Sequence, residues 1–174
     1  VLLQTHPDAD SMKVENDFSL DEVPLTLSHI RRRKLEEEAM NIFDVLLKFH
    51  GASHISSVNL IACTGTLCII AKRRPALMGP VIEALKSLHS NLPPTLTNSQ
   101  VISVRKTLKT NFISLLKQLS SFEWRSTIVP ILLDLGSSQN EINRALPKMD
   151  KKELLVRQKR ALENEEARVQ AKKA

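Results

Sequence analysis

The chain has 174 residues, a hydrophobic share of 42% and a net charge of +6, which suit one compact unit or part of a longer helical array. Five Phe, one Trp and no Tyr are too few for the stacked aromatic platforms that bind single-stranded nucleic acid. Four glycines are too few for glycine-rich phosphate loops. No apolar run approaches the roughly 18 residues of a membrane span, so we expect no membrane segment.

The charge of the chain is unevenly distributed. Residues 1–27 carry a net charge of −5, whereas residues 51–149 carry +7 and residues 150–174 carry +3. A basic field over the part expected to be most compact favours an acidic or phosphorylated partner.

The first part of the chain is expected to hold the end of an upstream helix and a long acidic loop, together spanning residues 1–27. The opening VLLQ resembles a helix end, and residues 5–27 show no helical stripe. Residues 5–27 contain Pro7, Pro24 and all six acids of residues 1–27. A loop of this length within a compact domain is uncommon, so we expect it to be functional or disordered.

Helical periodicity then predicts three helices in succession. The first is expected over 28–50 with Gly51 as a left-handed cap, and the second over 53–74 with Ser53 as N-cap. The body of the third is expected over 80–90, after a short turn set by two prolines. The residues expected to face inward are Leu35, Ala39, Ile42, Phe43, Leu46 and Leu47 in the first helix, Ile55, Val58, Ile61, Ala62, Cys68 and Ile69 in the second, and Val81, Leu85 and Leu88 in the third.

The stretch NLPPTLTNSQVISVRKTLKT, residues 91–110, predicts an abrupt stop and a new start. Pro93 and Pro94 prevent the third helix from continuing. Thr97 and Gln100 have the spacing of a capping box, in which each side chain accepts a hydrogen bond from the other residue's backbone amide. A fourth helix follows, and its expected inward residues are Val101, Val104, Leu108, Phe112, Leu115, Leu116 and Leu119.

The same pattern predicts three further helices. Ser120 and Glu123 have capping-box spacing before a fifth helix that ends at Gly136 and is kinked at Pro130. Ser138 and Glu141 start a short sixth helix, which Pro147 ends, and Asp150 starts a seventh. The seventh is mostly charged, with few apolar positions, so we expect a solvated rod or a frayed end.

These features predict an all-α fold of about seven helices, a fragment of a HEAT/ARM-like helical-hairpin solenoid with a right-handed α-α superhelix. We divide the chain into residues 1–27, a helical-repeat scaffold domain at 28–149 and a charged C-terminal helix at 150–174. A plain up-down bundle is the alternative.

The sequence contains no catalytic motif of the metalloprotease, serine-hydrolase, P-loop or dinucleotide-binding types. Cys63 and Cys68 lack a second pair, so two reduced, buried thiols in a reducing compartment are favoured over a zinc site. His50 and His54 are separated by Gly51, which argues against a shared metal. We therefore expect that the protein is not an enzyme and that it binds no cofactor, metal ion or small-molecule substrate.

Two basic clusters are the candidate partner-binding residues. Their members are Lys72, Arg73 and Arg74 at the end of the second helix and Arg105, Lys106 and Lys109 on the fourth. Stabilisation of the helix dipole is the competing interpretation for the first cluster, and an ordinary solvated face for the second. Lys151–Lys152 and the later Arg157, Lys159 and Arg160 have the composition of a nuclear import signal, a pattern with many false positives.

Four segments together resemble the N-terminal domain of the symplekin family. They are DFSLDEVP (17–24), HISSVNL (54–60), NLPPTLTNSQVISVRKTLK (91–109) and LLDLGSSQNEI (132–142). The resemblance covers about residues 17–149. It implies a HEAT-like solenoid and a nuclear, non-catalytic scaffold of mRNA 3′-end processing, in cleavage and polyadenylation and on histone pre-mRNA. It also implies protein partners, including a phosphatase of the RNA polymerase II C-terminal tail. The chain resembles the second half of that domain, without its earlier repeats.

Two other functions remain as alternatives from the residues. A basic helical-repeat module could bind RNA directly, with weak contacts to phosphates. An import-type cargo adaptor would require ladders of Asn and Trp, and the single Trp124 argues against it.

Overall fold

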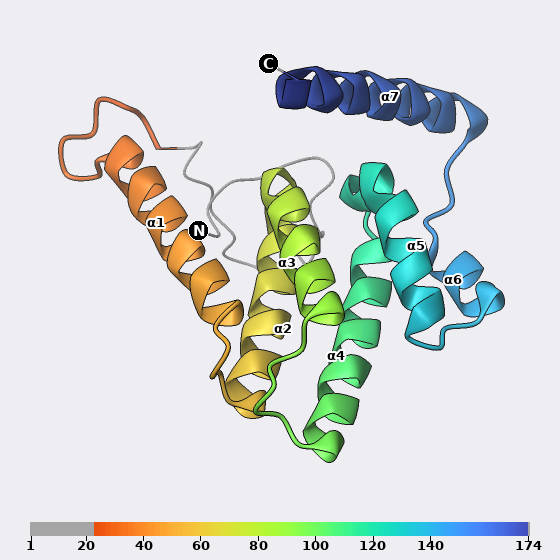
Figure 1. Cartoon of the computed structure of the whole chain (residues 1–174). Helices are drawn as coiled ribbons and strands as arrows, with labels where there is room; N and C mark the ends of the chain where they lie inside the picture. Colours follow the sequence, from red (N-terminus) through yellow and green to blue (C-terminus); the bar gives the residue numbers. More distant parts are fainter. Residues whose placement is uncertain (1–22, 174) are drawn as a thin grey trace.

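In the computed structural model, which describes residues 23–173, every regular element is helical (Figure 1). The predicted all-α fold is therefore confirmed for this part of the chain. VLLQ and residues 5–22 of the predicted acidic loop lie outside the described residues. The α-helices are α1 (Arg32–His50), α2 (Ser57–Arg73), α3 (Met78–Ser90), α4 (Asn98–Leu116), α5 (Arg125–Asp134), α6 (Gln139–Ala145) and α7 (Lys151–Lys173), and the 3₁₀-helices are η2 (Pro75–Leu77) and η3 (Leu119–Trp124).

The helices pack as successive hairpins. α2 packs most extensively against α4 and also contacts α1 and α3, while α5 contacts α3, α4 and α6. Figure 1 shows α2, α3 and α4 side by side, α1 at one edge, α5 and α6 at the other, and α7 crossing one end. This stacking agrees with a helical solenoid. No helix of the described residues is both long and apolar enough to cross a membrane.

The hydrophobic core is one cluster to which α1 through α6 contribute. Fully burying a large apolar side chain stabilises the fold by about 1.5–3 kcal/mol. The largest fully buried side chains are Phe43, Leu60, Leu67, Met78, Ile82, Leu85, Leu108, Phe112, Leu115, Leu116, Ile128 and Leu132. The inward residues predicted for α3, and Val104 to Leu116 of α4, are confirmed by this core.

Several helix ends form as the sequence predicts. The Thr97 amide donates to Gln100 Oε1 at 2.9 Å, and the Gln100 amide donates to Thr97 Oγ1 at 3.4 Å, so the capping box is present. Gly136 has φ of +82°, and the amide of Ser137 donates to the carbonyl of Leu132 at 2.9 Å. This left-handed glycine ends α5 in a Schellman motif.

The N-caps of the last two helices also follow the sequence. Ser138 Oγ accepts from the Glu141 amide at 3.2 Å, and Asp150 Oδ1 accepts from the Glu153 amide at 2.7 Å. Pro130 lies inside α5, as predicted.

The start of α1 and the turn into α2 differ from prediction. α1 begins at Arg32 rather than residue 28, and Gly51 has φ of −83°, so it is not left-handed. The N-cap of α2 is Ser56, whose side chain accepts from the Asn59 amide, and not Ser53. Either serine is a good N-cap, and the later start keeps Ile55, just before the helix, in the core.

Part of the predicted inward faces is also wrong. Leu35 is 39% exposed, Ile42 62%, Val58 73% and Ile69 50%, and Ala62 is exposed as well. The side of α2 that packs inward instead presents residues including Cys63, Thr64 and Ala71. α2 is apolar around most of its circumference, so periodicity alone does not select its buried side.

The predicted Ser120–Glu123 capping box does not form. Both residues lie within η3, and α5 starts at Arg125 with no side-chain cap. The Glu123 carboxylate instead accepts from Asn164 and Arg168 of α7. A long-range partner has therefore replaced the local hydrogen bond that the spacing suggested.

Candidate functional site

The first predicted basic cluster lies at the carboxyl end of α2. Lys72 and Arg73 are in its last turn, Arg74 is its C-cap, and all three side chains are half-buried. The Arg74 amide donates to the Ile70 carbonyl at 2.7 Å, which continues the helical hydrogen bonding past the last residue. Positive charge at this end also complements the helix dipole.

The second predicted cluster lies in the middle of α4, and its three members differ in environment. Arg105 and Lys106 are exposed, and neither side chain makes a hydrogen bond or ion pair within residues 23–173. Lys109 Nζ lies 3.2 Å from Glu141 Oε2 and donates to the Gly136 carbonyl at 3.3 Å. Lys109 therefore ties α4 to the start of α6, while Arg105 and Lys106 remain open to solvent.

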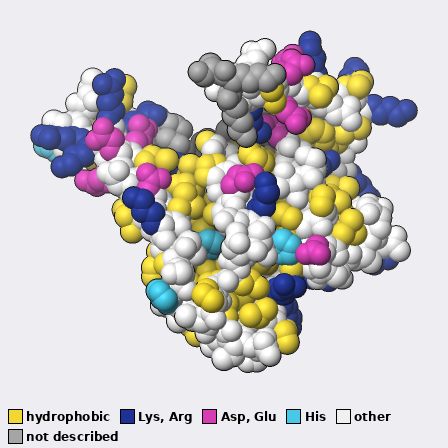
Figure 2. All heavy atoms as spheres, in the orientation of Figure 1, with side chains coloured by type: hydrophobic (Ala, Val, Ile, Leu, Met, Phe, Trp, Pro, Cys, Tyr) yellow, Lys and Arg dark blue, Asp and Glu magenta, His cyan; other side chains and the backbone are white. Residues whose placement is uncertain are grey.

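The acidic and basic residues at the start of α1 pair locally. Arg32 Nε lies 3.1 Å from Glu36 Oε1, one helical turn away. Figure 2 shows Lys or Arg side chains mixed with Asp or Glu side chains over this end of α1. No paired-carboxylate site converges there.

His50 and His54 do not share a site. His50 is buried, and its Nε2 lies 3.1 Å from Thr64 Oγ1, whereas His54 is exposed. Burial lowers the pKa of His50 below its ordinary value. In the described part of the chain, no group of three or more His, Cys, Asp or Glu side chains is placed to hold a metal ion.

The two cysteines are free thiols in the core, as predicted. The Cys63 thiol donates weakly to the Leu46 carbonyl at 3.6 Å. Burial raises the pKa of Cys63, and it raises that of Cys68 to about 12 against a smaller opposing effect of Lys72. Both thiols therefore stay protonated near neutral pH, which makes them poor nucleophiles.

A groove that sequence reasoning missed lies between the helical body and α7. Its cavity volume is about 640 Å³. One wall is formed by η2 and the first turns of α3, the floor by η3, and the other wall by α7. The lining includes Pro75, Pro80 and Glu83 on the first side, Phe122, Glu123 and Trp124 on the floor, and Arg157, Arg160 and Arg168 on α7.

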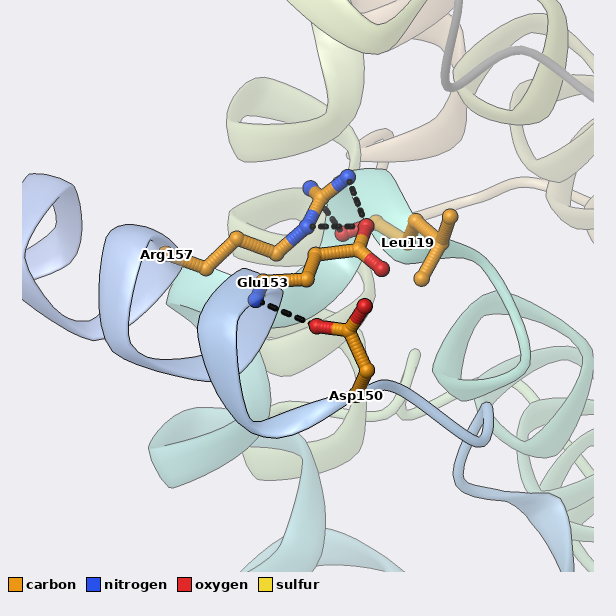
Figure 3. A network of polar contacts seen from close by, with 4 residues as sticks. All are labelled: Leu119, Asp150, Glu153 and Arg157. Atoms are coloured by element: carbon orange, nitrogen blue, oxygen red, sulfur yellow. Dashed lines mark hydrogen bonds and ion pairs between the residues drawn. The ribbon is translucent and has the colours of Figure 1, made fainter.

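α7 is held over η3 by polar contacts from its inner side. Arg157 Nη1 donates to the Leu119 carbonyl at 3.4 Å, while its Nε and Nη2 donate to Glu153 Oε1 at 3.2 and 3.1 Å (Figure 3). Farther along, Glu123 accepts from Asn164 at 2.8 Å and from Arg168 at 3.4 Å. The predicted solvated rod is therefore docked rather than free.

The floor of the groove is fixed by close packing of Trp124. A Cβ added at Gly79 would lie 2.5 Å from Trp124 Cζ2, so only glycine leaves room for the indole there. The Trp124 ring also makes a cation–π contact, since Arg168 Cζ lies 4.5 Å from the ring centre.

A further arginine lies beside the groove. Arg125 Cζ sits 4.5 Å from the Phe122 ring centroid, and its Nε and Nη2 are buried without a hydrogen-bond partner among the described residues. Burial lowers the pKa of Arg125, and the neighbouring charge of Arg157 lowers it further. The charges of Arg125 and Arg157 are therefore close enough to repel each other near η3.

No local pattern in the sequence could have identified this groove. Glu123 and Arg168 are far apart in the chain, and the spacing around Glu123 suggests a cap instead. The charged composition of α7 is the signal that the sequence offers, and it fits a solvated helix equally well.

A family model described as Symplekin/PTA1 N-terminal matches residues 1–154. The match covers α1 to α6 and only the first turn of α7.

Proposed function

Because the chain belongs to the Symplekin/PTA1 N-terminal family, a family of scaffolds in mRNA 3′-end processing, we propose that it holds protein partners of that machinery on its helical surface. A phosphatase of the RNA polymerase II tail is the partner proposed first, and the nucleus is the proposed location. The role proposed is non-catalytic, in keeping with the family.

The observation that supports this proposal most directly is the open basic surface of α4. Arg105 and Lys106 are exposed and make no ion pair within residues 23–173, so their charges are available to a partner. Lys72, Arg73 and Arg74 belong to the proposed surface as well, although their stems are half-buried. Lys109 contributes less, because Glu141 already neutralises it.

The test is the affinity of the purified protein for a purified polymerase-tail phosphatase. Reversing two exposed charges, Arg105→Glu with Lys106→Glu, is expected to weaken binding roughly fivefold to tenfold, mainly through slower association. Lys109 is left intact, because its reversal would oppose Glu141 and disturb the fold.

The matched control reverses two exposed lysines elsewhere, Lys48→Glu with Lys117→Glu, for the same change in net charge. The proposal for the α4 surface is refuted if both double variants lose affinity equally, or if neither does. Circular dichroism checks that both remain helical.

Direct RNA binding is the second candidate, because exposed Arg105 and Lys106 would also suit phosphate groups. The two functions differ in their response to salt. Each phosphate contact to single-stranded RNA contributes a slope of about −0.7 to the plot of log affinity against log salt. A labelled oligouridylate titrated at several salt concentrations gives that slope, and its loss in the α4 double variant would favour RNA.

A further inference from the structure

The groove between η3 and α7 carries more positive charge than its own acids neutralise. Glu153 and Glu123 neutralise Arg157 and Arg168, at 3.1 and 3.4 Å, and Glu83 pairs with Lys86 at 3.4 Å. Arg160 is exposed, lines the groove and makes no ion pair in the described part of the chain.

Arg125, whose guanidinium packs on the ring of the lining residue Phe122, adds a second uncompensated charge beside the groove. Its buried Nε and Nη2 have no acceptor among residues 23–173. The Ser120 hydroxyl, which lines the groove, is buried without a partner there too. Buried polar groups are normally hydrogen-bonded, so unsatisfied donors gathered beside one groove favour an anionic ligand.

The rest of the lining limits the kind of anion. Trp124, Phe122 and two prolines give the groove an apolar floor and side. The carboxylates of Glu83 and Glu123 also line it, and they would repel a continuous polyphosphate chain. A peptide can alternate anionic and apolar side chains and so match both features. The volume, about 640 Å³, suits a short extended segment rather than a folded domain.

We propose that this groove binds an extended acidic segment of a partner protein, with a carboxylate on Arg160 and an apolar side chain beside Trp124. The site is separate from the proposed α4 surface and shares no residue with it. Almost all of its α7 wall lies beyond the residues that match the family model.

The proposed test uses a labelled peptide of alternating Glu and Leu, with the Gln–Leu peptide as comparison. Anisotropy gives the affinity, and the fluorescence of Trp124, the one tryptophan of the chain, reports occupancy of the groove. The Glu peptide is expected to bind saturably and to change Trp124 emission. Arg160→Glu is expected to weaken it at least about tenfold, the size of one lost charge-assisted hydrogen bond.

The matched control is Lys152→Glu, an exposed residue on α7 outside the groove with the same charge change. Unchanged binding in this variant supports the proposal, and equal loss in both variants overturns it in favour of general attraction to net charge. Equal binding of the Gln peptide also overturns it.

Two further measurements test whether something other than a partner segment occupies the groove. Tighter binding of a labelled oligouridylate, abolished by Arg160→Glu, would identify a nucleic-acid site instead. A version of the chain that begins at Val23 is compared with the full chain, because residues 1–27 carry a net charge of −5. Peptide binding seen only in the shortened chain would mean that the protein's own acidic segment occupies the groove, and the proposal of a partner segment would fail.

Discussion

At the scale of single residues, His50 shows how a buried hydrogen bond fixes a tautomer. The Thr64 hydroxyl donates its proton to the Leu60 carbonyl at 2.8 Å. Since that proton is used, Thr64 Oγ1 accepts from His50, and Nε2 must carry the hydrogen at the 3.1 Å contact. The imidazole is neutral and buried, and a second proton would place a charge in the core.

This arrangement predicts that acid destabilises the fold. The pKa of His50 is below 6.5 in the folded state, so the unfolded chain takes up the proton first as pH falls. Stability is therefore full above about pH 6.5 and declines below it, by at most about 1.4 kcal/mol per pH unit for one group, until the folded-state pKa is passed. Urea unfolding at pH 7.5 and 5.5 measures this. His50→Gln should flatten the dependence and His54→Gln should not, and the reverse result would contradict the assignment.

Gly79 occupies a position where packing leaves no space for a side chain. The indole of Trp124 occupies the volume that a Cβ would take, at 2.5 Å. Gly65, in the interior of α2, has nothing within 4 Å of such a Cβ.

We therefore expect Gly79→Ala and Gly65→Ala to have opposite effects. The first should destabilise the protein by about 1–3 kcal/mol through overpacking and shift Trp124 emission. The second should stabilise it by about 0.5–1 kcal/mol, because alanine loses less backbone freedom in a helix. Chemical denaturation monitored by circular dichroism tests both variants. If Gly65→Ala also destabilised the protein, the loss in Gly79→Ala could not be assigned to overpacking against Trp124.

At the scale of elements, local patterns were reliable where the partner was also local. The Thr97 capping box, the helix end at Gly136 and the helix start at Asp150 form as predicted, because each uses groups close together in the chain. Glu123 has the same spacing signal, yet its carboxylate turns to α7. Spacing cannot reveal a competing partner from a distant helix.

The docking of α7 predicts a helix that can be released. Its contacts are mostly charged, and exposed ion pairs contribute only about 0–1 kcal/mol each. Glu123→Gln should lose the pair to Arg168 and weaken the hydrogen bond to Asn164. Trypsin should then cleave α7 roughly fivefold faster, the equivalent of about 1 kcal/mol.

Glu165→Gln, an exposed acid on α7 itself, is the control for this experiment and should leave the cleavage rate unchanged. High salt should accelerate cleavage of the unaltered protein and have less effect on Glu123→Gln. A rate insensitive to both changes would mean that apolar contacts hold the helix.

At the scale of the whole molecule, the fold class and helix order were predictable, but the placement of the basic residues was not. Stripes on α3 and α4 identify buried faces correctly, whereas α2 is apolar nearly all round, and Val58 points outward. Lys109 has no acidic residue close to it in the sequence. Only the packing of α6 against α4 brings Glu141 Oε2 to 3.2 Å from its Nζ. The groove at η3 depends on the same kind of long-range contact.

The distribution of the core predicts that α7 is dispensable for folding. Residues of α1 through α6 make up the buried apolar cluster, and α7 adds none of its members. A chain ending at Met149 should therefore keep its helical content apart from α7 and unfold cooperatively, with stability lowered by about 1–2 kcal/mol from the lost ion pairs. Urea denaturation tests this proposed boundary, and a non-cooperative transition would refute it.

The packing of α2 against α4 has a consequence for synthesis on the ribosome. α2 gains its principal neighbour only after the chain has been translated through Leu116, so the first hairpin emerges with much of its core face uncovered. We expect nascent chains stalled with residue 95 outside the exit tunnel to be digested quickly by protease, and those with residue 149 outside to resist. Early resistance would show that α1 and α2 settle before their later neighbours exist.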